Sequence, residues 1–323
     1  SLSTMREIVK EQEIYRRERM IGLQLIPYIF SKVWIGVPIA LYQAAIFLLF
    51  KKLAIDIPGG TEILGAMYVA LFLATLSGMV MGLLVSALAP NQNVAPLLTI
   101  IFLVPQITFG GGMLPIHTFG PPGEAINRVT LTKWPFETLV TITGIGKDVA
   151  NDTCWTQKTE DDRKNMSDEE KDKCGCLGPN LFTQCKFPGI SSKYDPAVDR
   201  PEPKKPADPG DPPPQPKKPE GQSLNAQQRY EDDLDQYQKD IDAYQDKVKS
   251  YKKDIDRWQN EYSDWKGKYE SAIGEAEGTI SKFYKDYGKM FDVPLTKHWS
   301  ILGGIMAAML ALLVVVQKRK DII

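Results

Sequence analysis

Apolar residues in this chain are gathered into four long runs, which are separated by polar or proline-rich segments. The runs cover residues 24–50, 63–88, 94–112 and 299–317. A helix that crosses the hydrocarbon core of a bilayer needs about 20 mostly apolar residues, and the buried helices of soluble proteins are usually shorter. The pattern therefore predicts an all-α membrane protein with four transmembrane helices.

The distribution of charge supports this interpretation. The 323 residues have an ordinary composition, with 43% hydrophobic residues, 24% charged residues and a net charge of −1. However, no Asp, Glu, Lys or Arg occurs between Ile63 and Gly123, and no soluble core explains so long an uncharged stretch. The near-zero net charge also provides no basic footprint for nucleic acid. We therefore expect neither an ordinary soluble enzyme nor a nucleic-acid-binding protein.

Basic residues beside the first and last runs predict the orientation in the membrane. They are Arg6, Lys10, Arg16, Arg17 and Arg19 before the first run, and Lys318, Arg319 and Lys320 in the tail 318–323. Because cytoplasmic flanks carry an excess of Lys and Arg, we expect both termini in the cytoplasm. Four crossings then place residues 116–298 outside, although Lys51 and Lys52 lie in a loop that this topology also places outside.

Two local patterns refine the arrangement of the predicted helices. Small residues recur every fourth position in the second run, at Ala74, Gly78, Gly82 and Ser86. Such a ladder lets helix backbones approach closely, so we expect this helix to lie inside the bundle. Residues 116–146 are too often interrupted by Gly and Pro to cross the membrane, and we expect re-entrant or interfacial segments there.

The cysteines predict a small external subdomain at residues 147–195. The only four, Cys154, Cys174, Cys176 and Cys185, fall within this segment. An even number in an oxidising space indicates two disulfides. Since Cys174 and Cys176 are too close to pair with each other, each should bond to Cys154 or Cys185. A zinc site is disfavoured because the spacing is not Cys-x-x-Cys, and no metal site is predicted.

The next two segments predict different backbone conformations. Residues 196–222 contain ten prolines and are expected to form an extended spacer, or alternatively a proline-rich ligand segment. In residues 223–292, an aromatic residue occurs at every seventh position from Tyr230 to Trp265, which predicts a long external coiled-coil helix. Its stripe would be covered by a second copy of the chain, by another protein, or by a hairpin that bends near Gly267 or Gly274.

Two stretches resemble known membrane transporters. Residues 13–38 resemble the start of the third transmembrane helix of type-2 ABC exporters, and the closest likeness is to the G (white/pigment) subfamily and its bacterial relatives. The matching positions are Glu13, Arg17, Glu18, Arg19, Tyr28, Ser31, Lys32 and Pro38. Residues 109–115, a glycine-rich end to an apolar run, resemble the end of the fifth helix of that fold. The likeness covers residues 5–145 and 295–320.

The resemblance implies that this chain supplies the last four helices of a six-helix permease. The first two helices and the ATPase domain of the family are missing, and no phosphate-binding Gly-x4-Gly-Lys-Ser/Thr motif occurs. We therefore expect a C-terminal part of a longer polypeptide, which binds no cofactor itself. ATP and Mg²⁺ would bind to an associated ABC ATPase domain, so this chain is not expected to be an enzyme.

The resemblance also implies roles for particular residues. Residues 1–20 would form an amphipathic coupling helix that docks on the ATPase through Arg17, Glu18 and Arg19, the alternative being a plain juxtamembrane anchor. The substrate cavity and the outer gate are expected on the predicted helices of residues 21–115. The cavity residues would be Tyr42, Gln43, Leu103 and Gln106, and the gate residues Met113 and Leu114.

The function expected from these features is ATP-driven export of an amphipathic or lipid-like substrate. The apolar helices offer walls without charged ligands, and no catalytic constellation of side chains can be placed. The expected partners are an ABC ATPase domain, a second copy in a homodimer, membrane lipid and a periplasmic protein bound to the coiled coil. The expected location is a bacterial inner membrane. The alternative function is a membrane-anchored coiled-coil scaffold that transports nothing.

Overall fold

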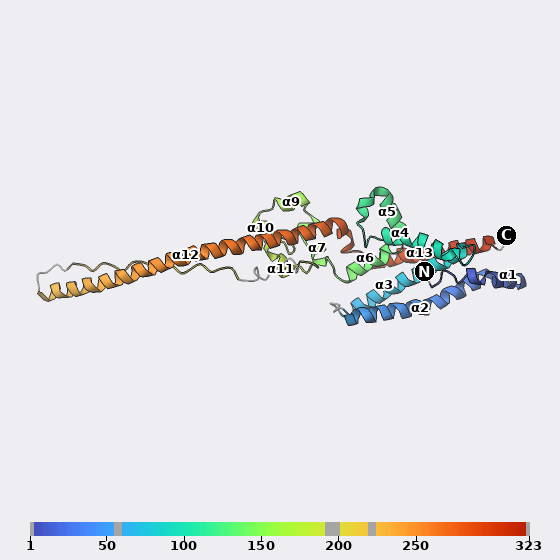
Figure 1. The fold of residues 1–323 in the computed structure, drawn as a ribbon, viewed down its shortest axis with the longest axis horizontal. Coiled ribbons are helices and arrows are strands. Elements are labelled where there is room, and N and C mark those ends of the chain that lie inside the picture. Colours follow the sequence, from blue (N-terminus) through green and yellow to red (C-terminus); the bar gives the residue numbers. More distant parts are fainter. Residues whose placement is uncertain (1–2, 55–59, 191–200, 219–223, 321–323) are drawn as a thin grey trace. The chain divides into compact units, whose positions relative to one another are not determined.

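The structure is a computed structural model, which describes residues 3–54, 60–190, 201–218 and 224–320. In these residues every regular element is a helix (Figure 1), which confirms the predicted all-α class. The chain divides into two compact units. The first contains residues up to 188 together with those from 278 onward, and the second contains residues 189–277.

The first unit is built around helices α2 (Leu25–Ala54), α3 (Thr61–Leu88), α4 (Val94–Thr108) and α13 (Leu295–Lys320). Helix α3 packs against both α2 and α13. Three of the four, α2, α3 and α13, are long and apolar enough to cross a membrane. Helix α4 is apolar but has only 15 residues, about 22 Å at 1.5 Å per residue. Length and composition therefore support three of the four predicted spans.

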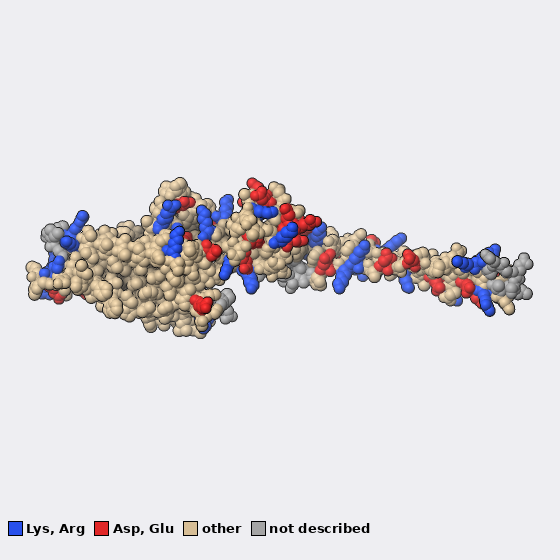
Figure 2. Space-filling view, turned by 180° about the vertical axis from the view of Figure 1, so that it is seen from behind, with Lys and Arg blue, Asp and Glu red and all other residues tan. Residues whose placement is uncertain are grey.

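The surface and the interior of the bundle both fit helices that lie in a membrane. Figure 2 shows a broad face of the bundle without Lys, Arg, Asp or Glu, as expected for a surface in contact with lipid. Helix α3 is buried on all sides from Met79 to Ala87, including the ladder residues Gly82 and Ser86. A helix that is buried all round belongs to the interior of a bundle, which agrees with the prediction from its small residues.

The segment after α4 folds into three short helices: η2 (Ile116–Phe119), α5 (Gly120–Val129) and α6 (Lys133–Ile142). Helix α6 packs against α3 and α13. Its Ile142 lies in a cluster with Met67 and Ala70, which belong to the first half of α3. These short helices therefore cover the end of the bundle at which α3 begins.

The cysteines belong to a group of short elements that follows α6. These are α7 (Lys147–Asn151), α8 (Thr153–Thr156), α9 (Glu160–Lys164), α10 (Asp168–Lys171), η3 (Gly178–Asn180) and α11 (Leu181–Gln184). Two disulfides are present, as predicted, and they join Cys154 to Cys174 and Cys176 to Cys185. The carboxylate of Asp152 accepts hydrogen bonds from the backbone N–H groups of Cys154 and Cys176, at 2.8 and 2.7 Å, and so connects the two bridges.

Helix α12 (Leu224–Tyr287) is unbroken over 64 residues and is followed by η4 (Gly288–Met290). The alternative in which this segment bends back at Gly267 or Gly274 is therefore wrong. In the second unit, residues 201–218 have no regular backbone hydrogen bonding and run beside α12 (Figure 1).

Candidate coupling end and outer mouth of the bundle

The N-terminal helix is set apart from the first span by a glycine. Helix α1 (Gln12–Ile21), preceded by η1 (Val9–Glu11), ends at Gly22, whose φ is 116°. L-residues rarely adopt this left-handed conformation, whereas glycine does so without steric cost. The N–H of Leu23 then donates to the carbonyl of Glu18 at 3.0 Å, which completes a helix-terminating motif. The chain can thus change direction before α2 begins.

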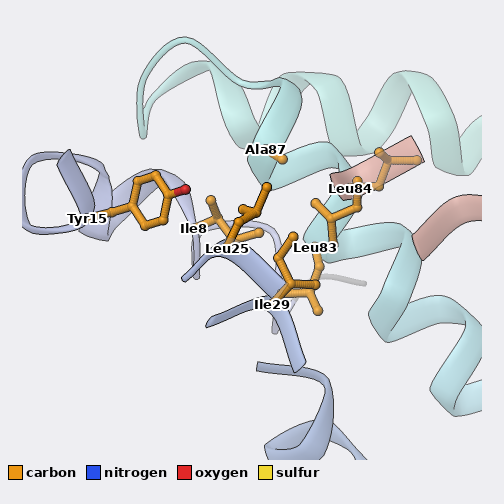
Figure 3. Packing of buried hydrophobic residues seen from close by; sticks show 8 residues of the cluster. Ile8, Tyr15, Leu25, Ile29, Leu83, Leu84 and Ala87 are labelled. Atoms are coloured by element: carbon orange, nitrogen blue, oxygen red, sulfur yellow. The ribbon is translucent and has the colours of Figure 1, made fainter. Parts of the chain in front are cut away.

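Apolar contacts attach this N-terminal segment to the bundle (Figure 3). Ile8 and Tyr15 are buried in a single apolar cluster with Leu25 and Ile29 of α2. Helices α3 and α13 also contribute residues to this cluster. The contributing residues of α3 and α13 are Leu83, Leu84, Ala87 and Leu313. The N-terminal segment therefore packs against all three helices that are long enough to span a membrane.

Backbone hydrogen bonds make the attachment specific. The hydroxyl oxygen of Ser86 in α3 accepts from the N–H groups of Ile8 and Val9, at 2.9 and 3.0 Å. At the same end of the bundle, the ammonium of Lys320 donates to the carbonyl of Ala89 at 3.0 Å. The N-terminal segment, the connection between α3 and α4, and the last turn of α13 thus lie together.

An ion pair links the N-terminal segment to α2. The Lys32 ammonium lies 2.5 Å from a carboxylate oxygen of Glu11, and the Lys32 side chain is only 15% exposed. The Tyr28 hydroxyl donates to the same carboxylate at 3.4 Å, and the Tyr28 ring lies 4.8 Å from that of Tyr15. The sequence singled out Tyr28 and Lys32, but it did not identify Glu11, because only the turn at Gly22 brings Glu11 to α2.

The three predicted coupling residues differ in their surroundings. Arg17 and Glu18 are exposed, whereas Arg19 is half-buried and donates to the carbonyl of Leu23. Next to them, Met20 and Ile21 are 82% and 88% exposed. The free face of α1 therefore combines charged and apolar side chains, as docking surfaces commonly do.

The residues predicted to line a substrate cavity are not gathered within one chain. Tyr42 and Gln43 are exposed on α2, and Leu103 is half-buried on α4. The side-chain carbonyl of Gln106 accepts from the N–H of Leu131 at 2.7 Å, so this residue holds the connection between α5 and α6. The predicted gate residues Met113 and Leu114 follow α4 and are exposed.

A buried polar cluster connects α6 to the start of α13. A carboxylate oxygen of Glu137 lies 2.8 Å from Nε2 of His298, and Nδ1 of His298 lies 3.2 Å from the carbonyl of Pro294. Both residues are less than a tenth exposed. Each imidazole nitrogen of His298 thus faces an oxygen atom, one from α6 and one from the backbone of Pro294. His298 is one of the two histidines of the chain, and no pattern in the sequence predicted this contact.

A cavity of about 570 Å³ opens beside this cluster. Its charged lining comes from α5, α6, the last turn of α12 and η4, and it includes Arg128, Lys133, Glu137, Asp286 and Lys289. Asp286 is 3.6 Å from Nε2 of His117, and Lys133 is 3.9 Å from Glu137. The described part of the bundle therefore has a polar mouth at the end opposite to α1.

Comparison with known proteins finds a similarity in the N-terminal part of the chain. Residues 1–143 match the family model of ABC-2 type transporters. Over 139 residues the chain is 30% identical to an ABC transporter ATP-binding/permease protein of Mycobacterium tuberculosis. The matched region covers 41% of this chain and 16% of that protein. No solved structure matches the chain. The match ends at the end of α6, so that α12 and α13 lie beyond it. In residues 1–143 the chain is therefore similar to ABC-2 type transporters, and its helices α2, α3 and α13 are long and apolar enough to cross a membrane.

Proposed function

We propose that the chain is the permease part of an ATP-driven exporter for an amphipathic or lipid-like substrate. The observation that carries this proposal is the two-sided environment of the N-terminal segment. One side is packed against α2, α3 and α13 through Ile8 and Tyr15. The other side leaves Arg17 and Glu18 exposed, with Met20 and Ile21 beside them. A segment with these two faces can receive a push from an ATPase and pass it to the spanning helices.

The contacts favour transmission through α2. The Glu11–Lys32 pair lies between the N-terminal segment and α2, and two hydrogen bonds to Ser86 add a link to α3. Because these links are polar and directional, a displacement of α1 changes their geometry more than it changes the apolar packing. We propose that the ATP and Mg²⁺ that power this movement bind to an associated ABC ATPase domain.

The two ends of the bundle support an orientation in the membrane. The N-terminal segment and the last turn of α13 share one end, which supports the placement of both termini on the same side. The basic residues there favour the cytoplasm, and the two disulfides favour an oxidising exterior for residues 116–298. In this topology α4 and the residues up to 112 form a fourth, short crossing. We propose a bacterial inner membrane as the location.

A second copy is proposed to complete the transport path. Apolar and polar side chains, including Tyr42 and Gln43, are exposed on α2, and α4 exposes a largely apolar face. In a homodimer these faces, with Leu103 and Gln106, would line the path for an amphipathic substrate. Met113 and Leu114 would then form its outer gate. Large apolar surfaces at helix interfaces suit substrates that partition from lipid.

The test uses the whole transporter, with its ATPase domain, reconstituted in proteoliposomes. We compare the Arg17→Ala/Glu18→Ala double variant with a Lys10→Ala control and measure both ATP hydrolysis and outward movement of a fluorescent phospholipid. The expected result is hydrolysis within about twofold of the parent and translocation reduced at least about tenfold, whereas the control changes neither. Unchanged translocation in the double variant would refute the coupling role. A parent protein without ATP-dependent translocation would favour the scaffold function.

A further inference from the structure

Between Leu234 and Trp258, one face of α12 is covered although no second helix lies beside this part of it in the described residues (Figure 1). Side chains on this face are half-buried, while nearly all side chains between them are exposed. The half-buried set from the first part of the helix comprises Leu234, Tyr237, Ile241, Tyr244, Val248, Tyr251, Ile255 and Trp258. This is the heptad stripe of the sequence, so the stripe has a partner within its own unit.

The partner is the proline strap, which we define as residues 201–218. The strap is extended and runs along α12 (Figure 1). Its half-buried residues are prolines, at positions 203, 206, 209, 213 and 216, whereas every other residue of the strap is exposed. A polyproline II helix has three residues per turn, so prolines at every third position share one face. That face of the strap is the one turned to the stripe.

A glycine explains the single irregular step in this spacing. The interval between half-buried prolines is three residues except from Pro209 to Pro213, where it is four. Between them, Gly210 has a φ of 85°, and its N–H donates to the side chain of Asp208 at 3.0 Å. This local turn inserts one residue and returns Pro213 and Pro216 to the inner face. The strap thus keeps its apolar face on α12 along its length.

Two hydrogen bonds set the register of the strap. The indole N–H of Trp258 donates to the carbonyl of Pro203 at 2.8 Å, and the hydroxyl of Tyr244 donates to the carbonyl of Gly210 at 2.9 Å. The strap therefore runs antiparallel to α12. The seven-residue step of a polyproline II helix spans about 22 Å, and the fourteen-residue step of an α-helix spans about 21 Å. The two repeats therefore match over this distance.

We propose that the aromatic stripe of α12 is a polyproline-binding surface that is occupied by the strap of the same chain. Aromatic-lined surfaces recognise polyproline II segments because the extended conformation is already formed and its carbonyl groups are free to accept hydrogen bonds. The part of α12 from Leu234 to Trp258 is then stiffened in cis by the strap, which has a different backbone conformation. The stripe needs neither a second copy of the helix nor a separate protein to shield it from water.

Photo-crosslinking in the full chain shows whether the stripe is covered by the strap, by a second copy of the chain or by another protein. Benzoylphenylalanine replaces Tyr244 in the stripe or, as a control, the exposed Lys247 on another face. Light- and heavy-isotope chains are mixed before irradiation, and the crosslinked peptides are identified by mass spectrometry. We expect Tyr244 to react at least about tenfold more than Lys247, with strap peptides of the same isotope. Crosslinks between light and heavy chains through α12, or to another protein, would overturn the proposal.

Matched proline variants provide an independent measurement. The inner variant carries Pro203→Ser, Pro206→Ser and Pro209→Ser, and the outer variant carries serine at the exposed positions Pro201, Pro212 and Pro214. Both lose three prolines, so the loss of backbone stiffness is the same. We expect amide hydrogen exchange in residues 237–258 to accelerate at least about tenfold in the inner variant and less than about twofold in the outer variant. Equal effects would contradict a face-specific contact.

Discussion

The carboxylate of Glu11 lies 2.5 Å from the ammonium of Lys32, so that two residues from different helical segments form the polar link between the N-terminal segment and the first span. Both side chains are mostly shielded from water, at 31% and 15% exposed. An ion pair in this environment is more sensitive to the loss of one partner than a solvated pair, since the remaining charge is left partly desolvated.

Removal of one partner of this pair should therefore lower the free energy of unfolding, and removal of both should lower it by less than the sum of the two single effects. We expect Glu11→Gln and Lys32→Met each to lower the free energy of unfolding by about 1–2 kcal/mol, and a double-mutant cycle to give a coupling energy of about 1 kcal/mol. Thermal unfolding in detergent provides the measurement. The control is the Glu7–Lys10 pair, which is 3.0 Å long but more exposed, and whose cycle should give less than about 0.5 kcal/mol. Equal coupling in the two cycles would contradict the prediction.

The Glu137–His298 contact predicts that two substitutions of Glu137 differ in their cost to stability. Substitution Glu137→Ala leaves the buried Nε2 of His298 without its 2.8 Å partner, which should cost about 1–3 kcal/mol. Glu137→Gln keeps a side-chain oxygen and should cost less. Hydrogen exchange at the first turns of α13 reports the effect locally. If both variants exchange like the parent protein, the contact does not hold α6 to α13.

The two disulfides should differ in their contributions. The Cys154–Cys174 bridge closes a separation of 20 residues, and the Cys176–Cys185 bridge closes one of 9. In the chain-entropy account the longer loop gains about 0.7 kcal/mol more. We therefore expect the double Cys→Ser variant that removes Cys154–Cys174 to lose more protease resistance than the one that removes Cys176–Cys185. Limited proteolysis of residues 147–188 provides the measurement. The opposite order would mean that packing around Trp155 and Asp152 dominates over loop entropy.

Two neighbouring glycines allow backbone strain to be separated from steric overlap. Gly144 and Gly146 both have positive φ, at 71° and 76°. A Cβ atom at Gly146 would lie 2.5 Å from the Phe291 ring, whereas one at Gly144 would meet nothing within 4 Å. We expect Gly144→Ala to cost about 1–2 kcal/mol from strain alone, and Gly146→Ala to cost more. Melting temperatures of the two variants test this order, and Gly146→Ala/Phe291→Ala should recover part of the difference.

The stability of the first turn of α9 should decrease in acid. Hydrogen bonds from the Thr159 hydroxyl and N–H lower the pKa of Asp162 below its ordinary value of 3.8. Because the folded-state pKa is the lower one, the stabilisation is present above the ordinary value and is lost as the pH falls through the folded-state pKa. Amide exchange of α9, corrected for its intrinsic pH dependence, should therefore increase only below about pH 4. Asp162→Asn should remove this step, and a variant that keeps it would exclude Asp162 as the cause.

Local chemistry along the chain was sufficient to predict much of the fold. The spans α2, α3 and α13 follow from runs of apolar residues, and the long α12 follows from its heptads, because each pattern is complete within its own segment. The disulfides were also predicted, but their pairing was left open. Cys174 and Cys176 differ by two positions, and only the folded structure shows that Cys174 bonds to Cys154 and Cys176 bonds to Cys185.

The sequence by itself determined the long helices α2, α3, α12 and α13, which segments are apolar enough for a membrane, and where the charged N-terminal segment lies. Only the tertiary structure decided which distant residues meet: Glu11 with Lys32, Glu137 with His298, and Trp258 with Pro203. The physical reason is that helix formation and membrane partitioning depend on neighbouring residues. A contact across 161 positions, such as that of Glu137 with His298, depends on how several helices pack together, and no local pattern records that packing.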